Sequence, residues 1–131
     1  MSQFRSSNKT VYSAKCHVVW CPEYRRGVLV GRVADRLEAI VREVVAEHDG
    51  EVLGLEVMPD HVHVLVEVSS AVPLLRLVQL LKGRSSRRLR QGFPRLRRLP
   101  ALWSPSWFVC TVGGAPLDVV RRYVENQKRA A

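Results

Sequence analysis

The sequence has few cysteines, and their arrangement excludes several classes of protein. Cys16, Cys21 and Cys110 are odd in number and scattered, without the paired CxxC spacing of a structural zinc site. A chain of 131 residues is long enough to bury a hydrophobic core without disulfide bonds. We therefore expect reduced thiols in a cytoplasmic protein, folded as a single domain over residues 1–131.

Long apolar segments are also absent. The first residues, MSQFRSSNKT, lack the hydrophobic region of an export signal, and no apolar run approaches the ~20 residues of a membrane helix. We expect a soluble protein that is not exported and has no membrane partner.

Acidic residues are missing from one long stretch. None occurs between Glu67 and Asp118, where nine arginines and lysines lie, and the chain has a formal net charge of +9. A basic run can be a solvated helix face, but this imbalance favours a polyanionic partner such as nucleic acid.

The spacing of apolar residues predicts the elements of an α+β fold. Strands are expected at about 11–20, 51–58, 61–68 and 106–112. Helices are expected at 33–50, where Gly50 acts as a stop signal, at 73–91, which ends near Gly92, and at 116–129. The order βαββαβ is the ferredoxin-like (RRM-like) plan, an antiparallel sheet with helices on one face, here with an additional C-terminal helix.

The segment MPDHVHVLVEV places two histidines on one face of a strand. Side chains alternate across a strand, so His61 and His63 lie on the face opposite Val62, Val64, Val66 and Val68. A tight turn at Pro59 and Asp60 predicts these opposed pairs: Val57 with Val62, Leu55 with Val64, Leu53 with Val66, Glu56 with His63, and Met58 with His61. The histidines can ligate a metal, with Glu56 orienting an imidazole, or can simply border the sheet. Two imidazoles alone make an incomplete metal site.

The last expected helix carries a second candidate pair. Tyr123 and Gln127 are four residues apart and so share one helix face. An amide oxygen can bind a hard cation and a phenolic oxygen can attack an electrophile, although such a tyrosine can also just pack its ring. Gly113 and Gly114 precede this helix and form either a hinge or an ordinary turn.

Four motifs in order, MPDHVHVL, LKGRSSRRL, LWSPSWFVCTVGG and VRRYVENQ, resemble the small single-tyrosine HUH transposases of insertion sequences, the IS200-like type. WCPEYRRGVL near the start also fits, and the resemblance spans about residues 12–127. It implies that His61, His63 and Gln127 bind a divalent metal, Mg²⁺ or Mn²⁺, and that Tyr123 is the nucleophile, forming a 5′-phosphotyrosine link to DNA and a free 3′-hydroxyl.

The resemblance further implies single-stranded DNA with hairpin structure as the partner, and a homodimer with composite active sites. In this setting we predict phosphate contacts from Arg84, Arg87 and Arg88, which share a helix face. Trp103, Trp107 or Tyr24 could stack on bases or belong to the core. Two alternatives are a non-catalytic single-stranded nucleic-acid-binding module and a related HUH nuclease that acts on host repeats.

Overall fold

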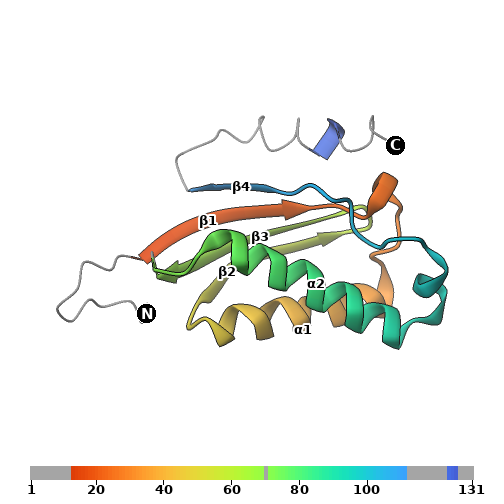
Figure 1. The fold of residues 1–131 in the computed structure, drawn as a ribbon, viewed down its shortest axis with the longest axis horizontal. Coiled ribbons are helices and arrows are strands. Elements are labelled where there is room, and N and C mark those ends of the chain that lie inside the picture. Colours follow the sequence, from red (N-terminus) through yellow and green to blue (C-terminus); the bar gives the residue numbers. More distant parts are fainter. Residues whose placement is uncertain (1–12, 70, 112–123, 127–131) are drawn as a thin grey trace.

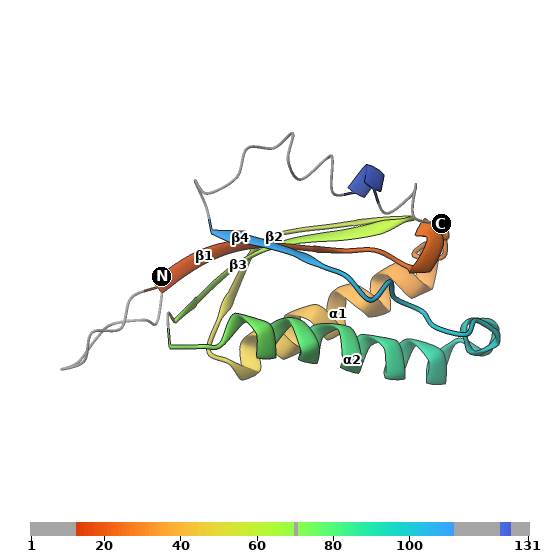
Figure 2. The same ribbon diagram turned by 45° about the horizontal axis from the view of Figure 1, so that its top comes forward.

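A four-stranded antiparallel sheet with two helices on one face forms the body of the protein (Figures 1 and 2). The structure, a computed structural model, describes residues 13–69, 71–111 and 124–126. The elements in chain order are β1 (Ser13–Trp20), η1 (Glu23–Arg25), α1 (Gly31–Glu47), β2 (Glu51–Met58), β3 (His61–Ser69), α2 (Leu74–Gly92), η2 (Pro94–Arg98) and β4 (Phe108–Thr111). The predicted βαββαβ order is confirmed.

The strands lie in the order β2-β3-β1-β4, so the histidine strand β3 is central, between β2 and β1. Of the expected C-terminal helix, only residues 124–126 are described, and they are helical. This piece, drawn in blue, lies on the opposite side of the sheet from α1 and α2 (Figures 1 and 2). The other residues of the expected helix, and the two glycines before it, lie outside the described residues.

The core fills the space between the sheet and the two helices. The valines of β3 that point to this side are at most 1% exposed: Val62, Val64, Val66 and Val68. Each helix contributes the apolar stripe that its spacing predicts, with these residues fully buried: Val33, Leu37, Ile40, Val41, Val44, Val45, Leu77, Val78, Leu81 and Leu89. Burial of these two stripes against the sheet is the main force that holds the layers together.

Trp103 belongs to this core and is not a free base-stacking platform. Its ring packs edge-on against Trp20 with 5.9 Å between centroids, and its indole N–H donates to Lys82 O and Ser85 Oγ. By contrast, Tyr24 and Trp107 are 54% and 37% exposed.

The register of β2 against β3 follows the prediction only for the half near the turn. Glu56 opposes His63 and Met58 opposes His61, as expected. Beyond Gly54 the pairing shifts by one residue, so that Val52 opposes Val66. The prediction that Leu53 pairs with Val66 is therefore wrong, because a β-bulge adds one residue to β2 and turns Leu53 outward, where it is 43% exposed.

The end of α1 also differs in detail from the expectation. The helix ends at Glu47, and the left-handed residue after it is Asp49, with φ of 55°, not Gly50. Gly50 is needed for another reason: a Cβ there would lie 2.8 Å from Val68 Cγ1 and 2.9 Å from Val45 Cγ1. The glycine thus allows the chain to pass closely between α1 and β3.

The last strand begins later than the predicted 106–112, at Phe108. Lys82 Nζ donates to the carbonyl oxygens of Ser104 and Ser106, at 2.7 and 3.1 Å. A side chain of α2 thus holds the chain before Phe108, where β4 begins. Val112 lies outside the described residues.

Candidate active site on the open face of the sheet

The two histidines of β3 lie on the face of the sheet that α1 and α2 leave uncovered. His61 and His63 are half-buried, whereas Val62 and Val64 between and beside them are fully buried toward the helices. Alternation along the strand therefore sets both imidazoles on one side, as predicted. Figures 1 and 2 show that side of the sheet free of α1 and α2.

Asp60 orients the imidazole of His61. The Nδ1 of His61 lies 2.9 Å from Asp60 Oδ1, and Arg25 Nε donates to Asp60 Oδ2 at 2.9 Å. Burial raises the pKa of Asp60, but hydrogen bonds from His61 and Arg25 outweigh it, so the pKa lies below its usual value. An ionised carboxylate only accepts hydrogen bonds, so His61 Nδ1 carries the proton. In the neutral ring with this tautomer, Nε2 carries the lone pair that a metal ion needs.

His63 contacts a third histidine. His17 of β1 lies beside it, with 2.8 Å between His17 Nδ1 and His63 Nε2 and 5.0 Å between the ring centroids. Burial, followed by the charge of His17, lowers the pKa of His63 below 6.5. His63 is therefore neutral at neutral pH, the form in which imidazole binds metals.

His17 was not predicted as a site residue. The sequence does hold a signal for it, because His17 alternates with the buried Cys16 and Val18 in β1 and so points to the open face. In the ferredoxin-like order the first strand pairs with the third, which brings His17 to the histidine strand.

A shallow hollow of about 210 Å³ opens beside this pair. It is lined by His17, Gly54, Leu55, Glu56, His63 and Leu65. A side chain at Gly54 would narrow the hollow, since a Cβ there would lie 3.8 Å from Leu65 Cβ. The hollow thus combines two imidazoles and one carboxylate with apolar walls.

The described residues do not complete a metal site by themselves. Within 13–69, 71–111 and 124–126, no three histidine, cysteine or acidic side chains are grouped so that they could hold an ion. The remaining predicted ligand, Gln127, and the predicted nucleophile, Tyr123, both lie outside the described residues. His61 nevertheless suits a cation, since a carboxylate fixes its tautomer, and His63 would offer a cation its Nδ1, because its Nε2 faces His17 Nδ1.

The C-terminal segment contacts this site through Arg25. Arg25 Nη1 donates to the carbonyl oxygen of Val124 at 3.2 Å. Val124 directly follows Tyr123 in the sequence, and the same guanidinium binds the carboxylate that orients His61.

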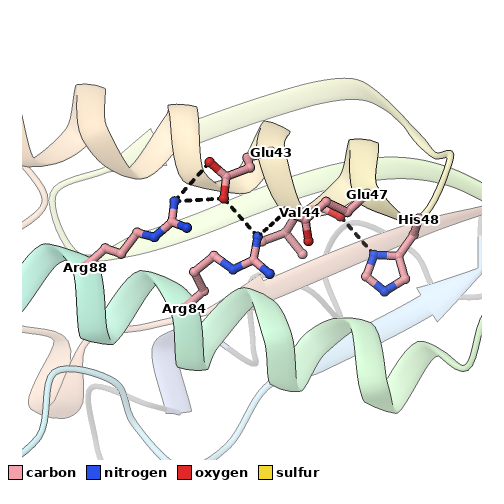
Figure 3. A network of polar contacts seen from close by, with 6 residues as sticks. All are labelled: Glu43, Val44, Glu47, His48, Arg84 and Arg88. Atoms are coloured by element: carbon pink, nitrogen blue, oxygen red, sulfur yellow. Dashed lines mark hydrogen bonds and ion pairs between the residues drawn. The ribbon is translucent and has the colours of Figure 1, made fainter.

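Two of the three arginines predicted to contact phosphate are engaged in ion pairs between helices. Arg84 Nη1 lies 2.9 Å from Glu43 Oε2 and 2.6 Å from Glu47 Oε2, and Arg88 Nη1 lies 2.7 Å from Glu43 Oε2. Figure 3 shows both arginines reaching from α2 toward α1, near His48, whose Nδ1 lies 2.9 Å from a backbone oxygen of α1. Hydrogen bonding from Arg88, ahead of that from Arg84, lowers the pKa of Glu43.

Arg87 is exposed on the same helix. The helix packs on the face of the sheet opposite the histidines, so a DNA strand bound there would not lie directly over them (Figure 2). Phosphate binding by these arginines stays a prediction.

No helix among the described residues has the length and apolarity to cross a bilayer. The cysteines they include are free, with Cys16 and Cys21 buried. Burial raises the pKa of Cys21 to about 11, which keeps this thiol protonated at neutral pH.

Comparison with known proteins identifies the family of this chain. Residues 10–127 match the family model described as "Transposase IS200 like". The chain is 39% identical over 120 residues to the ISDra2 transposase TnpA of Deinococcus radiodurans, covering 89% of this chain and 86% of the relative. It is 29% identical over 130 residues to the transposase of insertion sequence IS200 from Salmonella typhimurium, covering 97% of this chain and 85% of the relative.

Two solved transposase structures also superpose on this chain. A crystal structure of a candidate transposase from Deinococcus radiodurans R1 superposes with a TM-score of 0.84 at 35% identity, covering 95% of this chain and 98% of that one. A REP-associated tyrosine transposase bound to a REP hairpin superposes with a TM-score of 0.59 at 15% identity, covering 95% and 68%, and shares the fold. Because the family model spans nearly the whole sequence and a relative at 39% identity matches over most of its length, the chain belongs to the IS200-like transposase family.

Proposed function

We propose that this chain is a metal-dependent transposase that cleaves and rejoins single-stranded DNA at insertion-sequence ends. The observation that carries the proposal is the Asp60–His61 hydrogen bond, which fixes the ring of His61 beside His63. Both histidines lie on the face of the sheet that α1 and α2 leave uncovered, where a substrate can approach. Membership of the family supports the same reaction.

The metal site would use His61, His63 and the amide oxygen of Gln127, with Mg²⁺ or Mn²⁺ as the ion. When bound, such a cation polarises the scissile phosphate and stabilises the departing oxygen. Two imidazoles and an amide are all neutral, so they leave the ion its full charge for phosphate oxygens. The role of Gln127 rests on the resemblance, since this residue lies outside the described part of the chain.

The nucleophile would be the phenolic oxygen of Tyr123. It attacks the scissile phosphorus, the bond from phosphorus to the 3′-oxygen breaks, and the phenolic proton is lost while the 3′-oxygen gains one. The products are a 5′-phosphotyrosine and a free 3′-hydroxyl. A second 3′-hydroxyl then attacks the phosphotyrosine and releases the phenol, so strands are rejoined without ATP.

The substrate would be single-stranded DNA that folds into hairpins near the element ends. The fold neighbour bound to a REP hairpin supports a hairpin partner, although it shares only 15% identity with this chain. Identity to the insertion-sequence transposase of Deinococcus radiodurans is 39%. This closer relationship favours insertion-sequence ends over host repeats as the DNA that is cut.

The resemblance also implies a homodimer with composite sites, and we include the homodimer in the proposal. The contact between Arg25 and Val124 lies within one chain. Mixing inactive Tyr123→Phe with inactive His63→Ala chains distinguishes the two arrangements. If the mixture regains activity, the tyrosine works with the partner subunit's histidines, and if it does not, both groups act within one chain.

A covalent adduct tests the proposal. The protein is incubated with single-stranded DNA from the flanks of its own gene, with and without Mn²⁺, and separated under denaturing conditions. We expect an adduct that requires Mn²⁺ and is absent with Tyr123→Phe. A non-catalytic nucleic-acid-binding module would form no adduct, and Tyr123→Phe would leave its function intact.

A further inference from the structure

One guanidinium joins the turn before His61 to the segment that follows Tyr123 in the same chain. Arg25 Nε and Nη2 both bind Asp60 Oδ2, and Arg25 Nη1 donates to Val124 O at 3.2 Å. Asp60 lies in the β2–β3 turn, directly before His61, and Val124 directly follows Tyr123. The Arg25 side chain is only 17% exposed, so these bonds are partly shielded from water.

We infer that Arg25 is a positioning residue that ties the metal-binding end of β3 to the segment carrying the nucleophile. This inference rests on the proposed function. It assigns a role to Arg25 in addition to the two histidines, Gln127 and Tyr123.

The loop that presents Arg25 is fixed at several points. The Arg25 backbone N–H donates to Pro22 O at 2.9 Å, and Leu29 N–H donates to Pro59 O at 3.0 Å, next to Asp60. Arg25 and Tyr24 have φ of 49° and 59°, a left-handed conformation that non-glycine residues rarely adopt. Such a conformation persists only where surrounding contacts enforce it, so the guanidinium projects from a rigid support.

The two oxygens of Asp60 have separate partners. Oδ2 is held by Arg25, and Oδ1 remains for His61 Nδ1 at 2.9 Å. Without the guanidinium, the carboxylate is free to rotate, and the orientation of His61 is no longer fixed. The third hydrogen bond of Arg25 is independent of its bonds to Asp60, because Nη1 donates to Val124 O in the C-terminal segment.

Arg25 therefore has two separable effects. Through Asp60 it acts on metal affinity, and through Val124 it acts on the position of the segment that follows the nucleophile. A change at Asp60 removes only the first effect, whereas a change at Arg25 removes both. This difference provides the test.

The first measurement is the affinity of the full-length chain for Mn²⁺ without DNA, monitored by electron paramagnetic resonance. All chains in this measurement carry Tyr123→Phe. Asp60→Asn and Arg25→Ala are each expected to weaken binding about tenfold, the usual loss when a partner of a metal ligand is removed. Because both act through His61, the double variant should lose little more than either alone. Arg42→Ala is the matched control, since it removes an exposed arginine that pairs with Glu38 on α1, away from the histidines.

The second measurement is the single-turnover rate of adduct formation at saturating Mn²⁺, with Tyr123 present. Saturation offsets the loss of affinity, so Asp60→Asn should return to within about threefold of the original rate. Arg25→Ala should stay at least about tenfold slower, as expected when a reacting group is misplaced by a fraction of an ångström. If thermal melting shows that Arg25→Ala does not fold, Arg25→Gln replaces it in the same comparison.

The outcomes separate this inference from the proposed function. If the original chain forms no adduct on any flanking DNA, the proposed function fails, and the Mn²⁺ affinities alone then judge the role of Arg25. If the original chain forms the adduct but Arg25→Ala matches it in both measurements, the role assigned to Arg25 is wrong. If Arg25→Ala and Asp60→Asn behave alike at saturating Mn²⁺, the tie to Val124 has no part in the reaction.

Discussion

Replacing Gly50 by alanine should destabilise the protein by crowding the strand that carries the histidines. The new Cβ would lie 2.8 Å from Val68 Cγ1, 2.9 Å from Val45 Cγ1 and 3.1 Å from the carbonyl oxygen of Glu67. Both valines are 1% exposed, so neither methyl group can move into solvent. The backbone of Gly50 is not left-handed, so the crowding alone sets the cost, about 1–3 kcal/mol for overpacking.

The chain contains a matched control for this change. Gly83 lies inside α2, and a Cβ there would have no atom within 4 Å. Alanine in a helix interior is more favourable than glycine by about 1 kcal/mol. Gly83→Ala should therefore raise the free energy of unfolding, whereas Gly50→Ala should lower it by about 1 kcal/mol, the middle of the overpacking range less the same gain in chain entropy.

Urea unfolding at neutral pH, followed by the fluorescence of the buried Trp20 and Trp103, measures both changes. The two variants should differ by about 2 kcal/mol, with opposite signs. A Gly50→Ala protein as stable as the original chain would refute the close approach of α1 and β3 at this point.

Further predictions concern the histidines and the basic helix. His17→Ala should weaken Mn²⁺ binding about tenfold by freeing the ring of His63, and His48→Ala, at the end of α1, should not, as measured by titration of Mn²⁺. The pKa of His63 in the folded chain lies below 6.5, so the unfolded chain binds a proton at His63 more tightly than the folded chain does. The free energy of unfolding should therefore fall as the pH drops through 6.5. Urea unfolding at several pH values should show this fall, and His63→Gln should flatten it. Arg87→Ala should reduce the salt-dependence slope of DNA binding by about one, whereas Arg84→Ala, which breaks ion pairs to α1, should mainly lower the melting temperature.

The periodic features of the fold could be predicted because they are local. The apolar spacing from Val33 to Val45 and the valine alternation of β3 are visible within a few residues, and both led to correct elements and faces. The bulge in β2 could not be predicted in this way. Val52 and Leu53 are both apolar, so the pattern does not show which of them faces the core.

The contacts that complete the site are remote in sequence. His17 reaches His63, and Arg25 reaches Asp60, across 46 and 35 positions of the chain. Which distant side chains meet depends on the sheet order and on loop conformation, and no short pattern encodes these. The same reason explains why the pairing of Arg84 with glutamates of the neighbouring helix was not predicted.

In the proposed reaction, the histidine pair contributes to catalysis only if Tyr123 attacks the DNA at the same site. The most direct measurement is mass spectrometry of the protein after reaction with single-stranded flanking DNA and Mn²⁺, followed by nuclease and trypsin. We expect the peptide YVENQK, residues 123–128, to carry a 5′-phosphorylated nucleotide on its tyrosine. DNA attached to any other residue, or a peptide that stays unmodified while the DNA is cut, would contradict the account.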